Sequence, residues 1–347
     1  PLYNGQWSIV GTIYGTNWDK DFYLWNSGEA LYTDVVLHAG DEFKFRRDGD
    51  WEVNFGAADI TSVGGDYSAN YGISRGGANF VVEKDGLYYI TVNLVDNVLS
   101  MWREGDLPTP EGTSIWTGKA YMNNWDYVAT TNNFATKDVW VNNDLQEGDE
   151  IRIYYDGGRF DGKEYWAFQV YDSNWRNGYN YDSGGYNYWT GYVSLYVDWE
   201  WYNALTSQDS GNDAGLYIMG ENVTITAITL VKPYRPAEGE WTIIGTIYGS
   251  SWDRDFQMTD QSAAGSPGCW SAVLDYIKGE EFKFRKSGNW DVNLGFETEG
   301  GLTDNGNNSY SATLVQDGYN ISLPMEGKWS LAINTVENTL SATYNAN

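Results

Sequence analysis

The sequence contains few of the residues on which disulfide-bonded proteins and most hydrolases depend. Its 347 residues include one cysteine, one histidine and seven prolines. A single cysteine excludes an intramolecular disulfide framework. Cys269 and His38 lie far apart in the chain, so a catalytic Cys–His pair is not expected.

Long hydrophobic runs are also missing. No stretch approaches 18 consecutive apolar residues, so no membrane-spanning helix is predicted. The chain opens PLYNGQW, without the basic start and apolar core of a signal peptide, and we expect any export signal to have been removed. Motifs of the GxSxG, HExxH and phosphate-binding-loop types do not occur.

Positive charge is scarce. The 21 Lys and Arg residues stand against 48 Asp and Glu, which gives a formal net charge of −27. Nucleic acids and anionic lipid surfaces bind basic patches, so neither is an expected partner. The charge favours a neutral ligand, although an acidic secreted protein without a ligand would show the same composition.

Aromatic residues and glycine are abundant. The chain has 18 Trp, 28 Tyr and 40 Gly. Short aromatic and β-branched runs broken by Gly and Asn predict strands and turns, not helices.

Two segments of the chain repeat each other. WSIVGTIYG (7–15) returns as WTIIGTIYG (241–249), GDEFKFRRDGDWEVNFG (40–56) as GEEFKFRKSGNWDVNLG (279–295), and the block 79–100 as 320–341. Because the blocks keep their order, they indicate a duplicated domain. Alternation of apolar and polar residues within EFKFR predicts strands in each copy.

Proline-containing linkers at 106–112 and 234–240 separate the repeats from an unrelated middle segment. The sequence therefore predicts an all-β protein of three tandem β-sandwich modules. We call them module A (1–105), the middle module (113–233) and module A′ (241–347).

Three predicted strands of the middle module alternate between a core face and a face rich in tyrosine. The second face carries polar and aromatic side chains that suit sugar rings and hydroxyls, and Trp175 is a further candidate on a loop. The candidate binding residues are Tyr154, Tyr165, Gln169, Tyr171, Tyr192, Tyr196 and Trp175. Exposed aromatic patches tend to be functional, but these tyrosines could equally pack beneath loops.

The A and A′ repeats resemble the carbohydrate-binding modules of the SusE and SusF class, the starch-utilisation outer-membrane lipoproteins of Bacteroidetes. WSIVGTIYG with the following Trp18, EFKFRRDGDWEVNFG, and the block ending DGLYYITVNL carry the resemblance, which covers about 200 residues. The middle module, with its IWTG opening and GLYIMGENVTITAITLVKP ending, resembles a jelly-roll binding module attached to glycan-degrading enzymes.

This resemblance implies a non-catalytic cell-surface protein that binds polysaccharide or oligosaccharide, with starch or another α-glucan favoured. It implies an outer-membrane glycan uptake complex as partner, and a lipid anchor in the precursor as the only tie to the membrane. Because the middle module is not a third copy, β-glucan or hemicellulose remains an alternative ligand. The binding region of a larger glycoside hydrolase and a surface adhesin are the alternative functions.

Sites of this family combine two aromatic residues with Lys or Arg and an Asn. The matching positions are Trp18, Lys44, Arg46, Trp51 and Asn54 in module A, and Trp252, Lys283, Arg285, Trp290 and Asn293 in module A′. Lys44 and Arg46 alternate with two core phenylalanines, which suits a ligand-facing role. Trp51 alternates with Val53 and Phe55, so it could instead belong to the core.

Catalysis and cofactors are not expected. Glycoside hydrolysis needs a pair of carboxyl groups; Asp19 and Asp21 recur as Asp253 and Asp255, but turn-making is their more ordinary role. The runs YDSGGYN (181–187) and DSGNDAG (209–215) offer oxygen ligands, so a structural Ca²⁺ ion is possible in the middle module.

Overall fold

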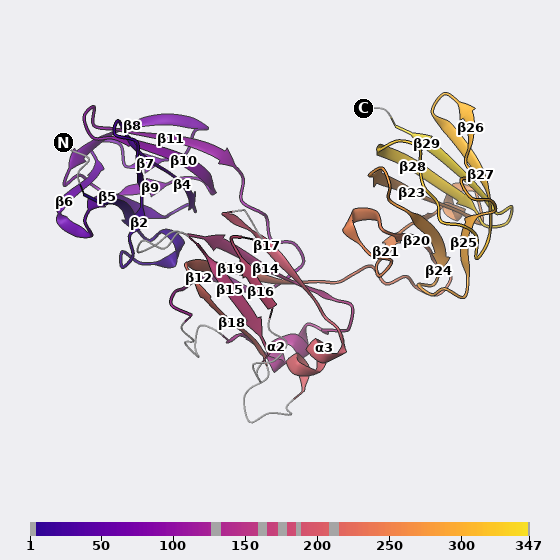
Figure 1. Ribbon diagram of the computed structural model, residues 1–347. Helices are drawn as coiled ribbons and strands as arrows, with labels where there is room; N and C mark the ends of the chain where they lie inside the picture. Colours follow the sequence, from indigo (N-terminus) through magenta and orange to yellow (C-terminus); the bar gives the residue numbers. More distant parts are fainter. Residues whose placement is uncertain are drawn as a thin grey trace. The chain divides into compact units, whose positions relative to one another are not determined.

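The computed structural model describes residues 5–125, 133–158, 165–172, 179–184, 189–207 and 215–345 (Figure 1). Over these residues the protein is all-β, as predicted, with two α-helices and three short 3-10 helices. The chain divides into two compact units, residues 1–232 and 233–347. Each predicted module has its own cluster of buried apolar residues. In the described part, no helix is both long and apolar enough to cross a membrane.

Module A is built from eleven strands whose sheets enclose one core. In order of pairing they run β2-β1-β5-β6-β8-β11-β10-β4-β3, with β7 and β9 added at β5. β8 joins the two layers, because it pairs with β6 at one end and with β11 along its first half. The elements are β1 (Trp7–Gly11), η1 (Ile13–Gly15), β2 (Phe22–Tyr23), β3 (Trp25–Asn26), β4 (Leu31–Leu37), β5 (Glu42–Arg47), β6 (Asp50–Ala57), β7 (Ser62–Val63), β8 (Ser68–Arg75), β9 (Phe80–Val82), β10 (Gly86–Asn93) and β11 (Val98–Gly105).

The alternation in EFKFR places its side chains as expected. Phe43 and Phe45 are fully buried, and their ring centroids lie 5.7 Å apart. Phe80 from β9 packs 5.2 Å from Phe43 and completes this part of the core. Lys44 and Arg46 therefore point to the other side of β5.

Module A′ repeats this topology. Its strands pair in the order β21-β20-β24-β25-β27-β29-β28-β23-β22, which matches module A strand for strand, with β26 added at β27. The elements are β20 (Trp241–Gly245), η2 (Ile247–Gly249), β21 (Asp255–Gln257), β22 (Thr259–Asp260), η3 (Ser262–Ala264), β23 (Cys269–Tyr276), β24 (Phe282–Lys286), β25 (Asn293–Phe296), β26 (Thr303–Gly306), β27 (Ser309–Gln316), β28 (Gly327–Asn334) and β29 (Thr339–Tyr344). The duplication inferred from the sequence is thus present in the structure.

The middle module consists of two four-stranded sheets, in the orders β12-β19-β14-β17 and β13-β18-β15-β16. Its core lies between them. The helix α3 begins at Asp198, whose carboxylate accepts a hydrogen bond from the Trp201 amide at 2.9 Å, a normal N-cap. The elements are β12 (Thr113–Met122), β13 (Asn133–Thr136), α2 (Lys137–Asn142), β14 (Glu150–Gly157), β15 (Ala167–Tyr171), β16 (Tyr179–Asp182), β17 (Thr190–Tyr196), α3 (Trp199–Thr206), β18 (Gly215–Glu221) and β19 (Val223–Val231).

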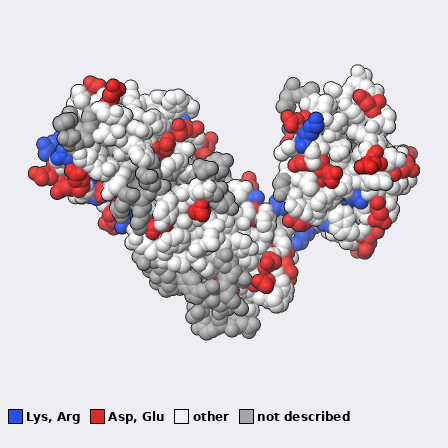
Figure 2. Space-filling view, in the orientation of Figure 1, with Lys and Arg blue, Asp and Glu red and all other residues white. Residues whose placement is uncertain are grey.

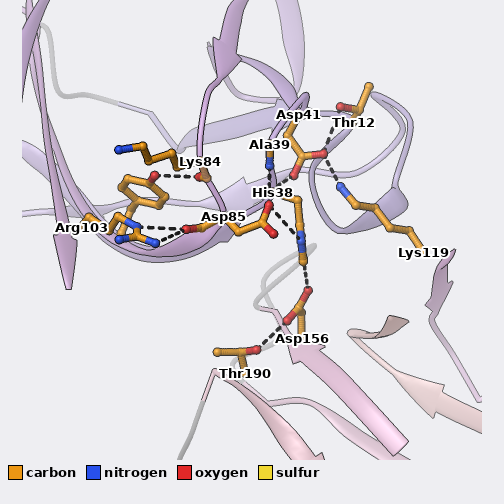
Figure 3. Close-up of polar contacts among 11 residues, drawn as sticks. Thr12, His38, Ala39, Asp41, Lys84, Asp85, Arg103, Lys119, Asp156 and Thr190 are labelled. Carbon is orange, nitrogen blue, oxygen red and sulfur yellow. Dashed lines mark hydrogen bonds and ion pairs between the residues drawn. The ribbon is translucent and has the colours of Figure 1, made fainter. Parts of the chain in front are cut away.

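Within the first unit, module A and the middle module are joined by polar contacts (Figure 3). His38 Nε2 lies 2.7 Å from Asp156 Oδ2, and Thr190 donates to the other oxygen of that carboxylate at 2.8 Å. Lys119 forms an ion pair with Asp41. These residues come from both modules, which explains why the two form one compact unit.

An apolar contact supports the same junction. Trp189, a loop residue of the middle module, packs against the core of module A, with its ring 6.3 Å from that of Phe22. Thr224 Oγ1 donates to the Tyr14 carbonyl at 2.6 Å.

Acidic side chains are spread over both units on the face shown in Figure 2, and Lys and Arg form no broad patch there. This distribution agrees with the sequence, in which Asp and Glu are spread along the chain.

Candidate functional site

Two tryptophans of module A lie together at its surface. The ring centroids of Trp18 and Trp51 are 5.8 Å apart, and their planes are inclined at 47°. Trp51 is 43% exposed near the start of β6, and Trp18 is half-buried on the loop after η1. Because the planes are inclined, the pair offers a bent apolar surface.

The backbone at Trp18 adopts an unusual conformation. Its φ is +69°, a left-handed region that bulky residues rarely occupy. The Trp18 amide donates to the Gly11 carbonyl at 2.7 Å, which holds the loop against β1. Strained backbone of this kind tends to occur at binding sites.

A buried ion pair lies under Trp51. The Arg46 guanidinium carbon is 4.9 Å from the Trp51 ring centroid, a cation–π contact. Arg46 donates to Asp21 through Nε at 2.8 Å and Nη2 at 2.7 Å, and Ser8 also bonds to this carboxylate. Burial alone would raise the pKa of Asp21, but the bonds from Arg46 and Ser8 outweigh it and lower the pKa. The carboxylate therefore stays charged and fixes the arginine.

This arrangement changes the role expected for Arg46. The sequence suggested a ligand contact, but the side chain is only 7% exposed and covered by Trp51. Arg46 and its counterpart Arg285, which is 9% exposed, are positioning residues that hold the tryptophan ring. The prediction failed because alternation identifies the side of a strand, not whether another side chain covers that side.

Polar groups of the predicted set lie beside the ring pair. Asn54 pairs with Arg46 across β5 and β6, and its amide donates to the Trp51 carbonyl at 2.6 Å. Its Oδ1 is buried without a hydrogen-bond partner among the described residues. Lys44 lies on the same side of β5, and burial lowers the pKa of its ammonium group. These groups could serve the hydroxyl rim of a ligand stacked on the rings.

Module A′ reproduces the site. Trp252 and Trp290 have centroids 6.0 Å apart and planes inclined at 41°. The Trp252 backbone again has a positive φ, +65°, and Arg285 lies 5.1 Å from the Trp290 ring. Arg285 is held by Asp255 at 2.8 and 2.5 Å.

The two copies differ in their asparagines. Asn293 is 3% exposed; its amide donates to the Trp290 carbonyl at 2.9 Å and to Asp317 at 2.7 Å. Lys283 donates to the Asn293 Oδ1 at 3.4 Å. The polar side of the A′ site is therefore more fully bonded internally than that of module A.

The tyrosines predicted to share one face of the middle module lie on two sheets. Tyr154 and Tyr192 are on β14 and β17 of one sheet, whereas Gln169 and Tyr171 are on β15 of the other. Since the core lies between the sheets, the two groups face opposite sides of the sandwich. The prediction of a single recognition face is therefore wrong, because alternation along a strand cannot show which strands pair.

Tyr154 is also not available to a ligand. It is 2% exposed, and its hydroxyl accepts from the Glu111 amide of the linker at 2.9 Å. Arg152 binds Glu111 at 2.6 Å and stacks 4.8 Å from the Tyr192 ring. Tyr154 thus packs beneath a connecting segment, the alternative left open by the sequence.

The other candidates of the middle module form no common site in the described residues. Tyr165, Tyr192 and Tyr196 are 47%, 43% and 57% exposed. The Tyr171 hydroxyl bonds to Gln169. Trp175 lies outside the described residues.

A metal site is not established by the structure. The described part of the chain holds no group of three or more His, Cys, Asp or Glu side chains that could bind an ion. Most of the run 209–215 and three of the seven residues of 181–187 lie outside that part, so structural Ca²⁺ remains a prediction.

Sequence reasoning missed the role of Asp21 and Asp255. They were considered as turn residues or as members of a catalytic pair, but each anchors the arginine under a tryptophan. The available signal was a constant spacing. Asp21 follows Ser8 by 13 residues and Asp255 follows Thr242 by 13 residues, and each carboxylate bonds to the hydroxyl of that residue.

No protein-family model and no curated protein matches the chain. Among solved structures, SGBP-B of the Bacteroides ovatus mixed-linkage glucan utilization locus, in complex with a mixed-linkage heptasaccharide, is 11% identical; the match covers 64% of this chain and 70% of that one, with a TM-score of 0.27. SusF from Bacteroides thetaiotaomicron is 12% identical, with coverages of 99% and 72% and a TM-score of 0.20.

Proposed function

We propose that this chain is a non-catalytic protein that binds a neutral polysaccharide through its two tryptophan pairs, with starch or another α-glucan as the favoured ligand. The observation that carries the proposal is the pair of inclined tryptophans over a buried arginine, built twice with centroid distances of 5.8 and 6.0 Å.

Sugar chemistry matches these sites. A pyranose ring has an apolar C–H face, which stacks on indole, and a rim of hydroxyls, which bond to amide and ammonium groups. Asn54 and Lys44 supply such groups beside Trp18 and Trp51. A neutral ligand is compatible with a protein of net charge −27.

The inclination of the rings supports the α-glucan. Planes that meet at 47° and 41° follow a curved chain better than a flat one. A β-glucan or hemicellulose is the alternative, and a polysaccharide panel distinguishes them.

The state of the acidic residues supports a binding role without catalysis. Glycosidases use one carboxyl as acid and another as base or nucleophile. Asp21 and Asp255 are instead each bound to two nitrogens of an arginine and to a hydroxyl. Both carboxylates are thus occupied by contacts within the protein.

The repeats' resemblance to starch-utilisation lipoproteins supports a place at the cell surface. There the protein would capture glycan for uptake and degradation beside an outer-membrane uptake complex, anchored by a lipid in its precursor.

Affinity gel electrophoresis tests the proposal with amylopectin, pullulan, dextran, mixed-linkage β-glucan, xyloglucan, xylan and mannan. We expect retardation by amylopectin or pullulan, and we expect Trp18→Ala with Trp252→Ala to raise the Kd at least about tenfold, or about 1.4 kcal/mol. Trp199→Ala is the matched control, because Trp199 is 64% exposed on α3 and belongs to neither pair.

Unchanged retardation in a folded Trp18→Ala/Trp252→Ala protein would refute the assignment of the sites. Retardation by a β-glucan alone would keep the binding role and replace the ligand. No retardation on any polysaccharide would favour a surface adhesin.

A further inference from the structure

The second layer of module A carries a row of aromatic residues that lies apart from the tryptophan pair. Strands β3, β4, β10, β11 and β8 are neighbours in that order, and the last four of them are labelled in Figure 1. Trp25 is the cross-strand partner of Tyr32, and Tyr89 is the partner of Trp102. We call these four residues, with Tyr67 just before β8, the aromatic strip.

The strip links its members by ring contacts or by strand pairing, and three of its five rings are exposed to solvent. The Tyr32 and Tyr89 centroids are 6.3 Å apart, and those of Tyr67 and Trp102 are 6.0 Å apart. Trp25, Trp102 and Tyr67 are 44%, 53% and 65% exposed. Four intervals between neighbouring strands, each about 4.8 Å, give the strip a length of about 19 Å.

The duplicated module shows that the fold does not require these rings. Equivalent strand positions in module A′ follow from the same pairings: Thr259 lies opposite Ser271, as Trp25 lies opposite Tyr32. Likewise, Ser330 lies opposite Thr343, as Tyr89 lies opposite Trp102. Four aromatics thus correspond to four small hydroxyl residues on the same sheet.

Without the rings, the A′ sheet face is hollow. Thr259, Ser271, Ser330 and Thr343 line a depression of about 330 Å³. Because the same sheet forms without aromatics, their presence in module A calls for an explanation other than folding. Exposed aromatic surface of this extent on a soluble protein usually marks a binding site.

Polar groups accompany the strip. Thr91 and Ser100 are cross-strand partners on the same face, and Ser100 pairs onward with Asn70. The outward positions of β4, β10 and β11 include the carboxyl groups of Asp34 and Glu104. These three strands contain no Lys, and their one basic residue, Arg103, is held by Asp106 and the Asp85 carbonyl. This composition disfavours nucleic acid or any other polyanion.

Two of these carboxyl groups, Asp34 and Glu104, interact with each other. Burial, and then the charge and hydrogen bond of Asp34, raise the pKa of Glu104. Glu104 therefore keeps its proton to a higher pH than an isolated glutamate, and the protonated carboxyl group can donate a hydrogen bond to a sugar hydroxyl.

We propose that the aromatic strip is a second glycan-binding site, which takes an extended, neutral polysaccharide chain laid across the strands of module A. The row is one residue wide and bordered by hydroxyl and amide groups, which suits a hydroxyl-rich chain better than the broad apolar core of a protein interface. Its rings are all Trp and Tyr, which combine an apolar face with a polar end. This proposed site is distinct from the tryptophan-pair sites, because the aromatic strip lies on a different layer of strands and favours a straight ligand.

The test uses the full chain with the tryptophan pairs disabled by Trp51→Ala and Trp290→Ala. Into this background goes the strip variant, Trp25→Thr, Tyr32→Ser, Tyr89→Ser and Trp102→Thr, which installs the residues found at these positions in module A′. Ile60→Ser, at a 60% exposed position between β6 and β7, is the matched control. The probes are mixed-linkage β-glucan, xyloglucan and mannan in affinity gels, with amylopectin as the curved ligand.

We expect at least one extended polysaccharide to retard the background protein and the Ile60→Ser control. The strip variant should lose this retardation, with a rise in Kd of at least about tenfold. If the fourfold variant melts at a lower temperature than its parent, the double variant Tyr89→Ser/Trp102→Thr takes its place in the affinity gels.

Absence of retardation of the background protein by every extended probe would overturn the proposal, and so would unchanged retardation of a folded strip variant. A wild-type dimer that becomes a monomer in the strip variant without loss of glycan binding would show an interface between copies instead. If disabling the tryptophan pairs changes nothing on any polysaccharide while the strip variant removes binding, the strip stands and the tryptophan-pair proposal fails.

Discussion

At the tryptophan-pair sites, some side chains are available to the proposed ligand, and others hold those side chains in place. Trp18 and Trp51 offer ring faces, whereas Arg46 and Asp21 form a buried ion pair beneath. Removing one partner of such a pair leaves an uncompensated charge, which costs more than the pair contributes. The anchor should therefore be sensitive to substitution.

We predict that Asp21→Ala destabilises module A by about 3 kcal/mol and also weakens polysaccharide binding, because Arg46 loses the carboxylate that fixes it. Urea unfolding and affinity gels measure the two effects. Asp19→Ala is the control, since Asp19 is exposed two residues away. Equal effects of the two substitutions would show that the ion pair does not support the site.

The contact between module A and the middle module depends on a loop and a strand edge. His38 follows β4, and Asp156 lies near the end of β14. Burial on its own lowers the pKa of His38, but the hydrogen bond and charge of Asp156 raise it, and the net shift is upward. Asp41 also raises it and Lys119 opposes it, while Asp85 lies 3.8 Å away.

This raised pKa makes the junction pH-dependent. A protonated His38 stabilises the folded state fully below its unfolded pKa of about 6.5, and the contribution is lost as pH rises through the higher folded value. We predict that the melting temperature of the wild type falls more between pH 6 and pH 8 than that of His38→Gln. The difference between the two proteins, followed by calorimetry, isolates this histidine from other titrating groups.

Asp156→Asn provides the companion measurement. It keeps a side chain of the same shape and removes the charge that raises the pKa of His38, so it should show the same reduced pH dependence. A wild-type pH dependence that survives in both variants would place its origin elsewhere.

At the scale of the whole molecule, the two tryptophan pairs belong to different compact units. One lies in residues 1–232 and the other in residues 233–347, joined through a short segment with Pro233 and Pro236. Linked sites gain from a high effective concentration when one long ligand reaches both.

We predict that Trp290→Ala weakens binding to amylopectin at least about tenfold but changes the intrinsic Kd for a short malto-oligosaccharide at the remaining site less than about twofold. Isothermal titration with the oligosaccharide and affinity gels with amylopectin provide the comparison. Trp51→Ala should show the same pattern. Equal losses on the short and long ligands would mean that the two sites act independently.

The sequence by itself determined the strands and the duplication. Period-two alternation placed Phe43 and Phe45 in the core, and the repeated blocks led to two modules of the same topology. Trp18, Trp51 and Asn54 could be named together only through the resemblance to the starch-utilisation modules, whose sites combine two aromatic residues with a basic residue and an asparagine.

Only the tertiary structure decided which faces those residues occupy and what covers them. Tyr154 is covered by the linker, and Gln169 belongs to a different sheet from Tyr192. The aromatic strip was not recognised from the sequence, since its members come from separate strands and become neighbours only through pairing. Alternation along a strand is a local property, whereas strand pairing and burial depend on contacts between distant segments.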